Sequence, residues 1–524
     1  SFTEVNTAEV FEEVECYCPT DTCQLDVDAD ALSDCVTPAG APCSPAAANG
    51  FASSCLTGGT ATAEAFLDAC PHLHLIAETG GKNATIITAM SDHESAISHV
   101  IQSAFGHAGQ KCSATSLLLL PGELYDDAAF ERMLVDAAAS LKPGAVWDLA
   151  TRINPLIRLP GTDLTRALTT LEPGERWALK PKQDQENPQL WSLGIKWGVK
   201  RGSFTHCNEF FGPLLGVMRY DSLKEAIDMV NETGYGLTSG LESLDDREQA
   251  TWKESIRAGN LYINRPTTGA IVNRQPFGGM GKSAFGSGIK AGGPGYVTQL
   301  MTFESKYSSE KVNVAILRDA ELRTGWPGLQ SQLQSCPNLD LNVLCRLLNS
   351  VASAWDTHYS QQHDPALILG EDNVQRYLVE SPASIRAMQS DSITSILGAV
   401  LSASMIGIDL ELSLPDAPLS PIFEAMTEWP GITTIHESSS ELASRIMACN
   451  SHNHPSRLRF LSEKAPVDVL KACHYHHIPV IRRSITTNGK LELLWWCREQ
   501  SLSHAYHRYG NLGHRADEPR HEPN

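Results

Sequence analysis

The chain has 524 residues, of which 42% are hydrophobic, with 41 basic and 61 acidic side chains. This length exceeds one ordinary core and predicts at least two domains. The formal net charge of −20 disfavours nucleic acid and anionic membranes as partners, and no apolar run is long enough for a transmembrane helix. We therefore expect a cytoplasmic protein that acts on a small molecule.

The fourteen cysteines show no regular spacing, which favours reduced thiols over a disulfide framework. Residues 1–54 are rich in proline, alanine and serine around residues 37–42, which predicts an irregular start. Ser1 opens the chain without signal-peptide features, and we expect a fragment of a longer protein. Six early cysteines lack the paired spacing of a zinc site, so no metal site is predicted there: Cys16, Cys18, Cys23, Cys35, Cys43 and Cys55.

Helix and strand patterns alternate from Ser91 onward, which predicts an α/β fold. The first helix ends at Gly109, and residues 114–120 then form a buried strand. Its apolar face consists of Ala96, Ile97, Val100, Ile101, Ala104, Phe105 and Ala108. The later pattern predicts helices over 124–140, 222–232 and 245–258, strands over 214–220 and 260–264, and a glycine-rich, functional loop over 265–295.

A polar stretch over residues 302–311 predicts a linker, after which a second α/β region begins. Its pattern is clearest near the end, where we expect a strand over 457–461, a helix over 467–476 and a strand over 478–485. Residues 491–496 are expected to pair back as a strand, because Asn488-Gly489 favours a tight hairpin turn.

Cys112 is the strongest candidate for chemistry, since it lies in a short polar turn beside Lys111. Glu78, in the sequence Glu-Thr-Gly-Gly-Lys, is an upstream candidate for a general base. A thiolate attacks an aldehyde to give a thiohemiacetal, hydride loss leaves a thioester, and a carboxylate activates the water that releases the acid. Taken singly, a buried thiol and a solvated carboxylate are the simpler interpretations.

Several separated motifs resemble the aldehyde dehydrogenase superfamily. Residues 78–82 resemble its general-base motif, 109–112 its nucleophile motif and 208–213 its cofactor-ribose motif. The resemblance implies that NAD is the cofactor, with Glu209 on the nicotinamide ribose and Phe211 beside the nicotinamide. The turn that contains Gly58, Gly59 and Thr60 resembles the turn beside the cofactor pyrophosphate, with a glycine at Gly59 where serine is usual.

The glycine-rich residues 265–279 resemble one subfamily, the L-glutamate γ-semialdehyde (1-pyrroline-5-carboxylate) dehydrogenases. That resemblance implies oxidation of the semialdehyde to L-glutamate. The backbone N–H groups of Gly269 and Ala270 and the hydroxyl of Ser113 would hold the substrate α-carboxylate, and Phe277 would line the same site. Backbone amides in a glycine turn suit an anion, and a hydroxyl adds a donor.

Residues 498–513 resemble the terminal segment of the bifunctional proline-utilisation (PutA) family. The resemblance implies a remnant of the NAD-binding domain over 1–77, a catalytic domain over 78–301, and a structural, degenerate aldehyde-dehydrogenase-like α/β domain over 312–524. It also implies an upstream proline dehydrogenase domain with FAD in the full-length protein. We expect a homo-oligomer.

The chain departs from the family pattern before Glu78, where only 77 residues precede the base. The asparagine of the oxyanion hole has no match there, and its loss would cost about 3 kcal/mol of transition-state stabilisation. Two alternatives therefore stay open: a truncated, non-catalytic oligomerisation module, and an aldehyde dehydrogenase for another substrate. Two histidine groups, around His474 and His504, lack carboxylate or cysteine partners at metal-ligand spacing.

Overall fold

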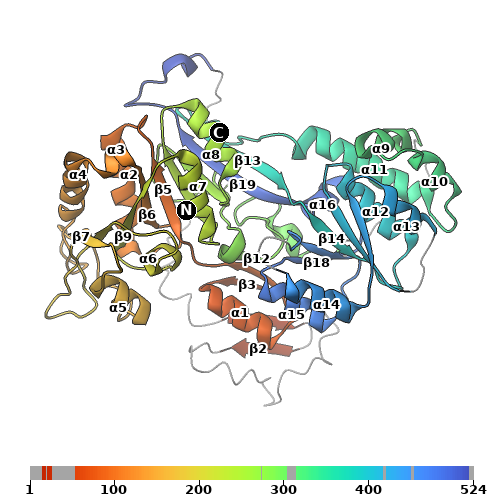
Figure 1. The fold of residues 1–524 in the computed structure, drawn as a ribbon, viewed down its shortest axis with the longest axis horizontal. Coiled ribbons are helices and arrows are strands. Elements are labelled where there is room, and N and C mark those ends of the chain that lie inside the picture. Colours follow the sequence, from red (N-terminus) through yellow and green to blue (C-terminus); the bar gives the residue numbers. More distant parts are fainter. Residues whose placement is uncertain are drawn as a thin grey trace.

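The computed structural model describes residues 53–272, 274–303, 314–416, 421–449 and 454–518, together with the backbone of strands β1 (Val14–Cys18) and β2 (Asp21–Leu25). Most of the predicted irregular start and of the predicted linker lies outside these residues. The described part folds into two lobes, each built on a sheet covered by helices (Figure 1). The predicted α/β class is confirmed.

The first lobe is built on a nine-stranded sheet of order β13-β19-β11-β10-β5-β6-β9-β8-β7. The strands from β19 to β8 run parallel, and antiparallel β13 and β7 form the edges. Their bounds are β5 Asn83–Ile87, β6 Thr115–Pro121, β7 Arg176–Leu179, β8 Gly194–Trp197, β9 Leu214–Tyr220, β10 Thr238–Glu242, β11 Asn260–Ile263, β13 Glu371–Val379 and β19 Cys497–Ala505.

Helices cover both faces of this sheet, so its central strands are apolar on both sides. In β6, Leu117 and Leu119 pack with one cluster, whereas Leu118 and Leu120 pack with the other, as the two-residue period of a strand requires. The helices are α2 His93–Phe105, α3 Gly122–Tyr125, α4 Ala128–Ala139, α5 Thr162–Thr169, α6 Phe204–Cys207, α7 Leu223–Glu232 and α8 Asp246–Ser255. The elements predicted between residues 91 and 264 are confirmed within a few residues at their ends.

Helix α2 carries the chain to the predicted nucleophile. All seven residues of its predicted face are buried, and Asp92 caps its start by accepting a hydrogen bond from Ser95 N at 3.3 Å. A short turn of helix follows, and Gly109 adopts a φ of 69°, which a residue with a side chain rarely tolerates. The chain then reverses into the loop that contains Cys112.

A three-stranded sheet of order β12-β4-β3 precedes the large sheet. Its strands are β3 Ser53–Thr57, β4 His74–Glu78 and β12 Ala284–Phe285. Parallel β3 and β4 are joined through helix α1 (Thr60–Ala69), which makes a βαβ unit. Glu78 is the last residue of β4, and the carboxyl ends of parallel strands are where such folds place their sites.

The second lobe contains five parallel strands in the order β16-β15-β14-β17-β18. This is a doubly wound order, because the chain starts at the centre and adds strands to each side in turn. The strands are β14 Ala383–Arg386, β15 Leu410–Leu414, β16 Ile432–His436, β17 Leu458–Phe460 and β18 Val480–Arg482. The helices are α9 Ile316–Thr324, α10 Leu329–Ser335, α11 Leu341–Ala354, α12 Ile393–Ser404, α13 Pro421–Ala425, α14 Ser439–Ala448, α15 Val467–Tyr475 and α16 Gly489–Leu494.

The prediction for residues 488–496 is wrong. Asn488 caps helix α16, its side chain accepting hydrogen bonds from Lys490 N and Leu491 N, where a hairpin strand was expected. The strand predicted over 478–485 is shorter, at Val480–Arg482. After α16 the chain leaves the second lobe, and β19 pairs with β11 of the first lobe (Figure 1).

Candidate active site

The structure brings the predicted nucleophile and base motifs together. Asn83, just after the base motif, donates its side-chain N–H groups to the carbonyl oxygens of Cys112 at 2.6 Å and Ala114 at 3.0 Å. A Cβ atom on Gly81 would lie 2.8 Å from the Cys112 carbonyl oxygen. The two loops are therefore in direct contact, and glycine is needed where they meet.

The Cys112 thiol is half-buried between two carboxylates. Burial raises its pKa first, and the negative charges of Glu209 and Glu78 raise it further. The backbone N–H groups of Ser113 and Cys112 act in the opposite direction. The thiol is thus held protonated at rest and has carboxylates nearby that can receive its proton.

Glu78 is placed as a base would be. Its Oε2 accepts a hydrogen bond from Gly279 N at 3.0 Å, and burial raises its pKa to about 7, against the positive charges of Lys290 and Arg498. A carboxyl group with a pKa near neutrality both accepts and returns a proton at physiological pH.

Glu209 lies against the turn between these two motifs. Its Oε1 accepts a hydrogen bond from Gly81 N at 2.9 Å, and a Cβ on Gly80 would overlap its Oε2 at 1.8 Å. Burial raises the Glu209 pKa, while the Gly81 N–H and Lys82 lower it. The carboxylate therefore occupies space that exists only because residue 80 is glycine.

Phe211 and its neighbour Phe210 have different environments. Phe211 is 40% exposed with a φ of 52°, whereas Phe210 is buried beneath the Lys82 ammonium, 4.5 Å from its ring centre. Lys82 Nζ is buried without a hydrogen-bond partner among the described residues, and burial lowers its pKa to about 7. Phe211 is the member of the pair that is free to contact a ligand.

Gly58, Gly59 and Thr60 form the turn that opens helix α1. No side chain caps this ten-residue helix, and its first turn carries no acidic residue, so its N-terminal N–H groups can receive an anion. The chemistry of these groups suits NAD, because a free helix N-terminus can receive a pyrophosphate and the Glu209 carboxylate can accept hydrogen bonds from ribose hydroxyls.

The predicted substrate residues lie on loops tied to the nucleophile. Ser113 is buried, and its carbonyl oxygen accepts a hydrogen bond from Thr267 Oγ1 at 3.1 Å. Gly269 follows two residues later with a φ of 95° and open space at its Cβ position, and Ala270 is exposed. Phe277 is half-buried and exchanges backbone hydrogen bonds with Ala291.

Sequence reasoning missed the charged residues behind Glu78. Lys290 is buried, and its Nζ donates to Gly259 O, Asn260 Oδ1 and Pro276 O. Arg498 and Glu499 reach the same region from β19. Lys290 lies in the glycine-rich loop, whereas Arg498 and Glu499 lie in the terminal segment. Only the pairing of β19 with β11 brings the three residues together, and the sequence did not reveal that pairing.

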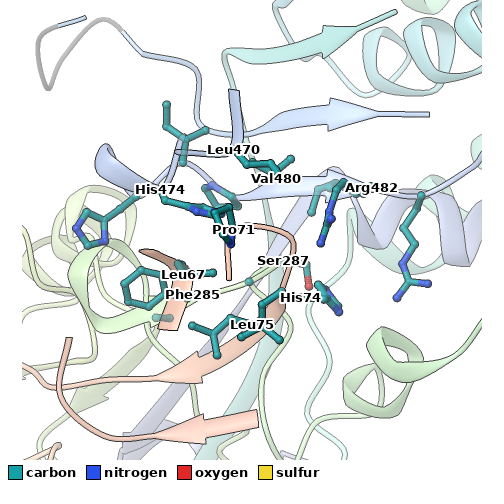
Figure 2. Close-up of a pocket in the computed structure, with 18 of the residues that line it drawn as sticks. Leu67, Pro71, His74, Leu75, Phe285, Ser287, Leu470, His474, Val480 and Arg482 are labelled. Carbon is teal, nitrogen blue, oxygen red and sulfur yellow. The ribbon is translucent and has the colours of Figure 1, made fainter. Parts of the chain in front are cut away.

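A cavity of about 60 Å³ lies elsewhere, between the βαβ unit and the second lobe. Figure 2 shows Leu67, His74 and Phe285 on one side and Leu470, His474 and Arg482 on the other. Neither Cys112 nor Glu78 lines it. Arg482 donates to His72 O at 2.8 Å, so this cavity marks the contact between the lobes.

Within the ranges given above, no group of three or more His, Cys, Asp or Glu side chains is arranged to hold a metal ion. No helix within those same ranges has the length and apolar character needed to cross a membrane.

Comparisons with known proteins identify the family of the chain. The family model described as aldehyde dehydrogenase family matches residues 42–305, half of the chain. Bifunctional protein PutA of Escherichia coli is 37% identical over 235 residues, which cover 43% of this chain and 18% of that protein. The 1-pyrroline-5-carboxylate dehydrogenase of Bacillus subtilis is 31% identical over 237 residues, or 45% of each chain.

A solved structure of proline utilization A from Corynebacterium freiburgense is similar over a longer stretch. It has a TM-score of 0.68 and 34% identity, and the match covers 87% of this chain and 42% of that one. This chain thus spans less than half the length of these relatives. The family match and the geometry around Cys112 lead to one conclusion: the chain belongs to the aldehyde dehydrogenase family.

Proposed function

We propose that the chain catalyses the NAD-dependent oxidation of L-glutamate γ-semialdehyde to L-glutamate, a step of proline breakdown. The observation that carries the proposal is that the Cys112 loop and the Glu209 carboxylate both meet the turn at residues 80–81, two residues after Glu78. The charges of Glu209 and Glu78 both act on the Cys112 thiol. The names of the PutA and 1-pyrroline-5-carboxylate dehydrogenase relatives support the substrate class.

In this proposal the thiol proton of Cys112 passes to a nearby carboxylate as the sulfur forms a bond to the aldehyde carbon. The backbone N–H of Cys112 stabilises the resulting oxyanion. NAD, when bound by Glu209, Phe211 and the turn at residues 58–60, supplies the acceptor for the hydride. Glu78 then takes a proton from water as that water adds to the thioester carbon and the carbon–sulfur bond breaks. L-Glutamate leaves and the thiol is restored.

We assign substrate selection to the residues that would contact the end of the substrate opposite its aldehyde group. The exposed turn at Gly269 and Ala270 presents backbone N–H groups, and Ser113 lies beside the nucleophile. Together they suit the α-carboxylate that distinguishes this semialdehyde from simple aldehydes. Phe277 would line the same pocket.

The test is NADH formation from the semialdehyde by the whole chain. Cys112→Ala is expected to abolish NADH formation, because it removes the nucleophile, whereas Cys449→Ala, a half-buried thiol on the second lobe, leaves the rate unchanged. Persistent turnover by Cys112→Ala would contradict the assignment.

Two other outcomes define the competing functions. Within the described residues, Glu78 ends a single βαβ unit. If neither NADH formation nor NAD binding is found, a non-catalytic oligomerisation module is favoured. Faster turnover of an aldehyde without an α-carboxylate would indicate a different substrate.

We extend the proposal to the organisation of the protein. Residues 1–77 are a remnant of the NAD-binding domain, 78–301 the catalytic domain, 302–311 a linker and 312–524 a structural domain. The PutA relatives support a bifunctional full-length protein. We propose that this protein carries an upstream proline dehydrogenase domain with FAD and is a cytoplasmic homo-oligomer.

A further inference from the structure

A group of charged side chains from the last strand of the chain lies directly behind the predicted base. A Cβ on Gly278 would lie 2.8 Å from Glu78 Oε1 and 3.2 Å from Lys290 Cγ. The side chains of Glu78 and Lys290 therefore converge on one glycine. The Lys290 ammonium donates its three hydrogen bonds to neutral oxygens of residues 259, 260 and 276. Its positive charge is therefore offset by the nearby carboxylates of Glu78 and Glu499 without a direct hydrogen bond from the ammonium.

Glu499 of β19 holds the backbone of that lysine. Its Oε2 accepts a hydrogen bond from Lys290 N at 2.8 Å, and its Oε1 has no hydrogen-bond partner among the described residues. A Cβ on Gly293 or Gly295 would lie 3.2 Å or 3.0 Å from the two Glu499 oxygens. Two glycines of the loop thus leave room for this carboxylate.

Arg498 makes a parallel connection to the base loop. Its Nη1 lies 3.5 Å from Gly279 O, and its Nε donates to Glu380 Oε1 at 2.6 Å. Glu380 is also 3.8 Å from the buried Arg457. Gly279 is the residue whose N–H binds Glu78, so strand β19 contacts this loop at both Gly279 and Lys290.

We propose that Glu499 is a positioning residue for the base Glu78 and acts through Lys290. This inference rests on the proposed function, since it takes Glu78 as the base that hydrolyses the Cys112 thioester. The Glu499 carboxylate favours the protonated form of Lys290, and the Lys290 charge in turn stabilises the Glu78 carboxylate. The last strand of the chain thereby sets the pH at which the hydrolytic step begins.

The charged groups around the base determine the expected sign. Glu78 faces Lys290 from the loop and Arg498 from β19, with Cys112 and Tyr296 also near. Lys290 faces Glu78, Glu499 and Arg498. Because Glu499 raises the pKa of Lys290, removing its charge leaves Lys290 neutral more often and raises the pKa of Glu78.

The experiment uses p-nitrophenyl acetate, which requires no NAD. The Cys112 sulfur bonds to the acetyl carbon as p-nitrophenolate leaves and the thiol proton passes to a base; water then displaces the sulfur and gives acetate. The first step produces a burst and the second, which needs Glu78, limits the steady rate. The steady rate of the whole chain is followed against pH at a wavelength where p-nitrophenol and its anion absorb equally.

Glu499→Gln keeps the hydrogen bond to Lys290 N and removes only the charge. We expect it to move the pH midpoint of the steady rate upward by about half a unit to one unit, with an unchanged burst. Lys290→Met is expected to move the midpoint in the same direction and serves if Glu499→Gln does not fold. Glu242→Gln is the matched control, since Glu242 is equally buried in the same large sheet but pairs with His99.

Two results would overturn the inference. An unchanged midpoint in both variants would show that the base does not depend on Glu499. A downward shift in Glu499→Gln would show a direct like-charge effect on Glu78 instead of one through Lys290. If the burst and the shift appear but the semialdehyde yields no NADH, the positioning role stands and the proposed substrate or cofactor fails.

Discussion

Under the proposed function, Glu78 makes the hydrolytic step depend on pH near neutrality. Burial raises its pKa to about 7, and only the carboxylate form can take a proton from water. The rate should therefore rise as pH increases through about 7 and level off above it, whereas an ordinary glutamate would give a midpoint near 4.3. The pH profile of steady-state NADH formation measures this, and a rate already constant at pH 5.5 would contradict it.

Gly80 tests the assignment of the Glu209 carboxylate. In Gly80→Ala the new Cβ would overlap Glu209 Oε2, so the carboxylate must move and its charge-assisted contacts are lost. We expect NADH affinity to fall about 10- to 100-fold, equivalent to about 1.5–3 kcal/mol, as measured by NADH fluorescence titration.

Gly106→Ala is the control for that substitution, because nothing lies within 4 Å of its Cβ position. The p-nitrophenyl acetate burst should persist in Gly80→Ala, since Cys112 remains. Unchanged NADH affinity would remove Glu209 from the cofactor site.

At the level of single residues, local sequence located the two short motifs that the structure brings into contact, while the roles of Cys112 and Glu78 stay predictions. Cys112 and Glu78 lie in short motifs whose other residues are required by the local backbone. Gly81, for example, is needed where the two loops touch, because a Cβ there would be too close to Cys112 O. Lys290 and Glu499 were not predicted as a pair. They are 209 positions apart in the chain, and only the pairing of β19 with β11 brings them together.

The second lobe shows how one dipeptide can mislead. Asn488-Gly489 predicts a hairpin, yet Asn488 caps α16, and Gly489 packs against α11 so closely that a Cβ would lie 2.2 Å from Ser350 O. The glycine serves close helix contact, and local propensity cannot distinguish that role from a turn.

Gly489→Ala is therefore expected to destabilise the protein by about 2 kcal/mol or more, because the neighbouring backbone must shift. The measurement is the free energy of unfolding by urea, with Gly106→Ala as the open-site control. A cost equal to that of the control would mean that α16 does not pack as described.

Strand β19 could not be recognised from its composition. Its residues Arg498, Glu499, Gln500, Ser501 and Ser503 are polar, yet each is at most 8% exposed. Their side chains form hydrogen bonds within the protein; Ser501 Oγ, for example, donates to Pro276 O at 2.6 Å. Apolar periodicity, which correctly located β6 and β9, does not apply to a strand of this kind.

For the molecule as a whole, the shared sheet predicts one cooperative unfolding transition. β13 and β19 belong in sequence to the second lobe but are strands of the first. Calorimetry should therefore give a single transition with equal calorimetric and van't Hoff enthalpies. Two separated transitions would indicate lobes that fold independently.

Ser501→Pro tests the same connection, because it removes the N–H that donates to Gly259 O at 3.0 Å. We expect loss of the folded chain or a greatly lowered Tm. Ser501→Ala retains that backbone bond and is the matched control. A Tm equal to that of Ser501→Ala would show that the β11–β19 pairing is dispensable.

The pairing of β11 with β19 also sets an order of events during synthesis on the ribosome. Leu261 pairs with Leu502, so β11 has no partner on this edge until a strand some 240 residues later has been synthesised. That synthesis takes roughly 10 to 50 seconds at ordinary elongation rates. During that interval an apolar parallel sheet has an open edge, which invites pairing with other nascent chains. We expect a chaperone that shields strand edges to raise the yield of this protein more than a faster translation rate would.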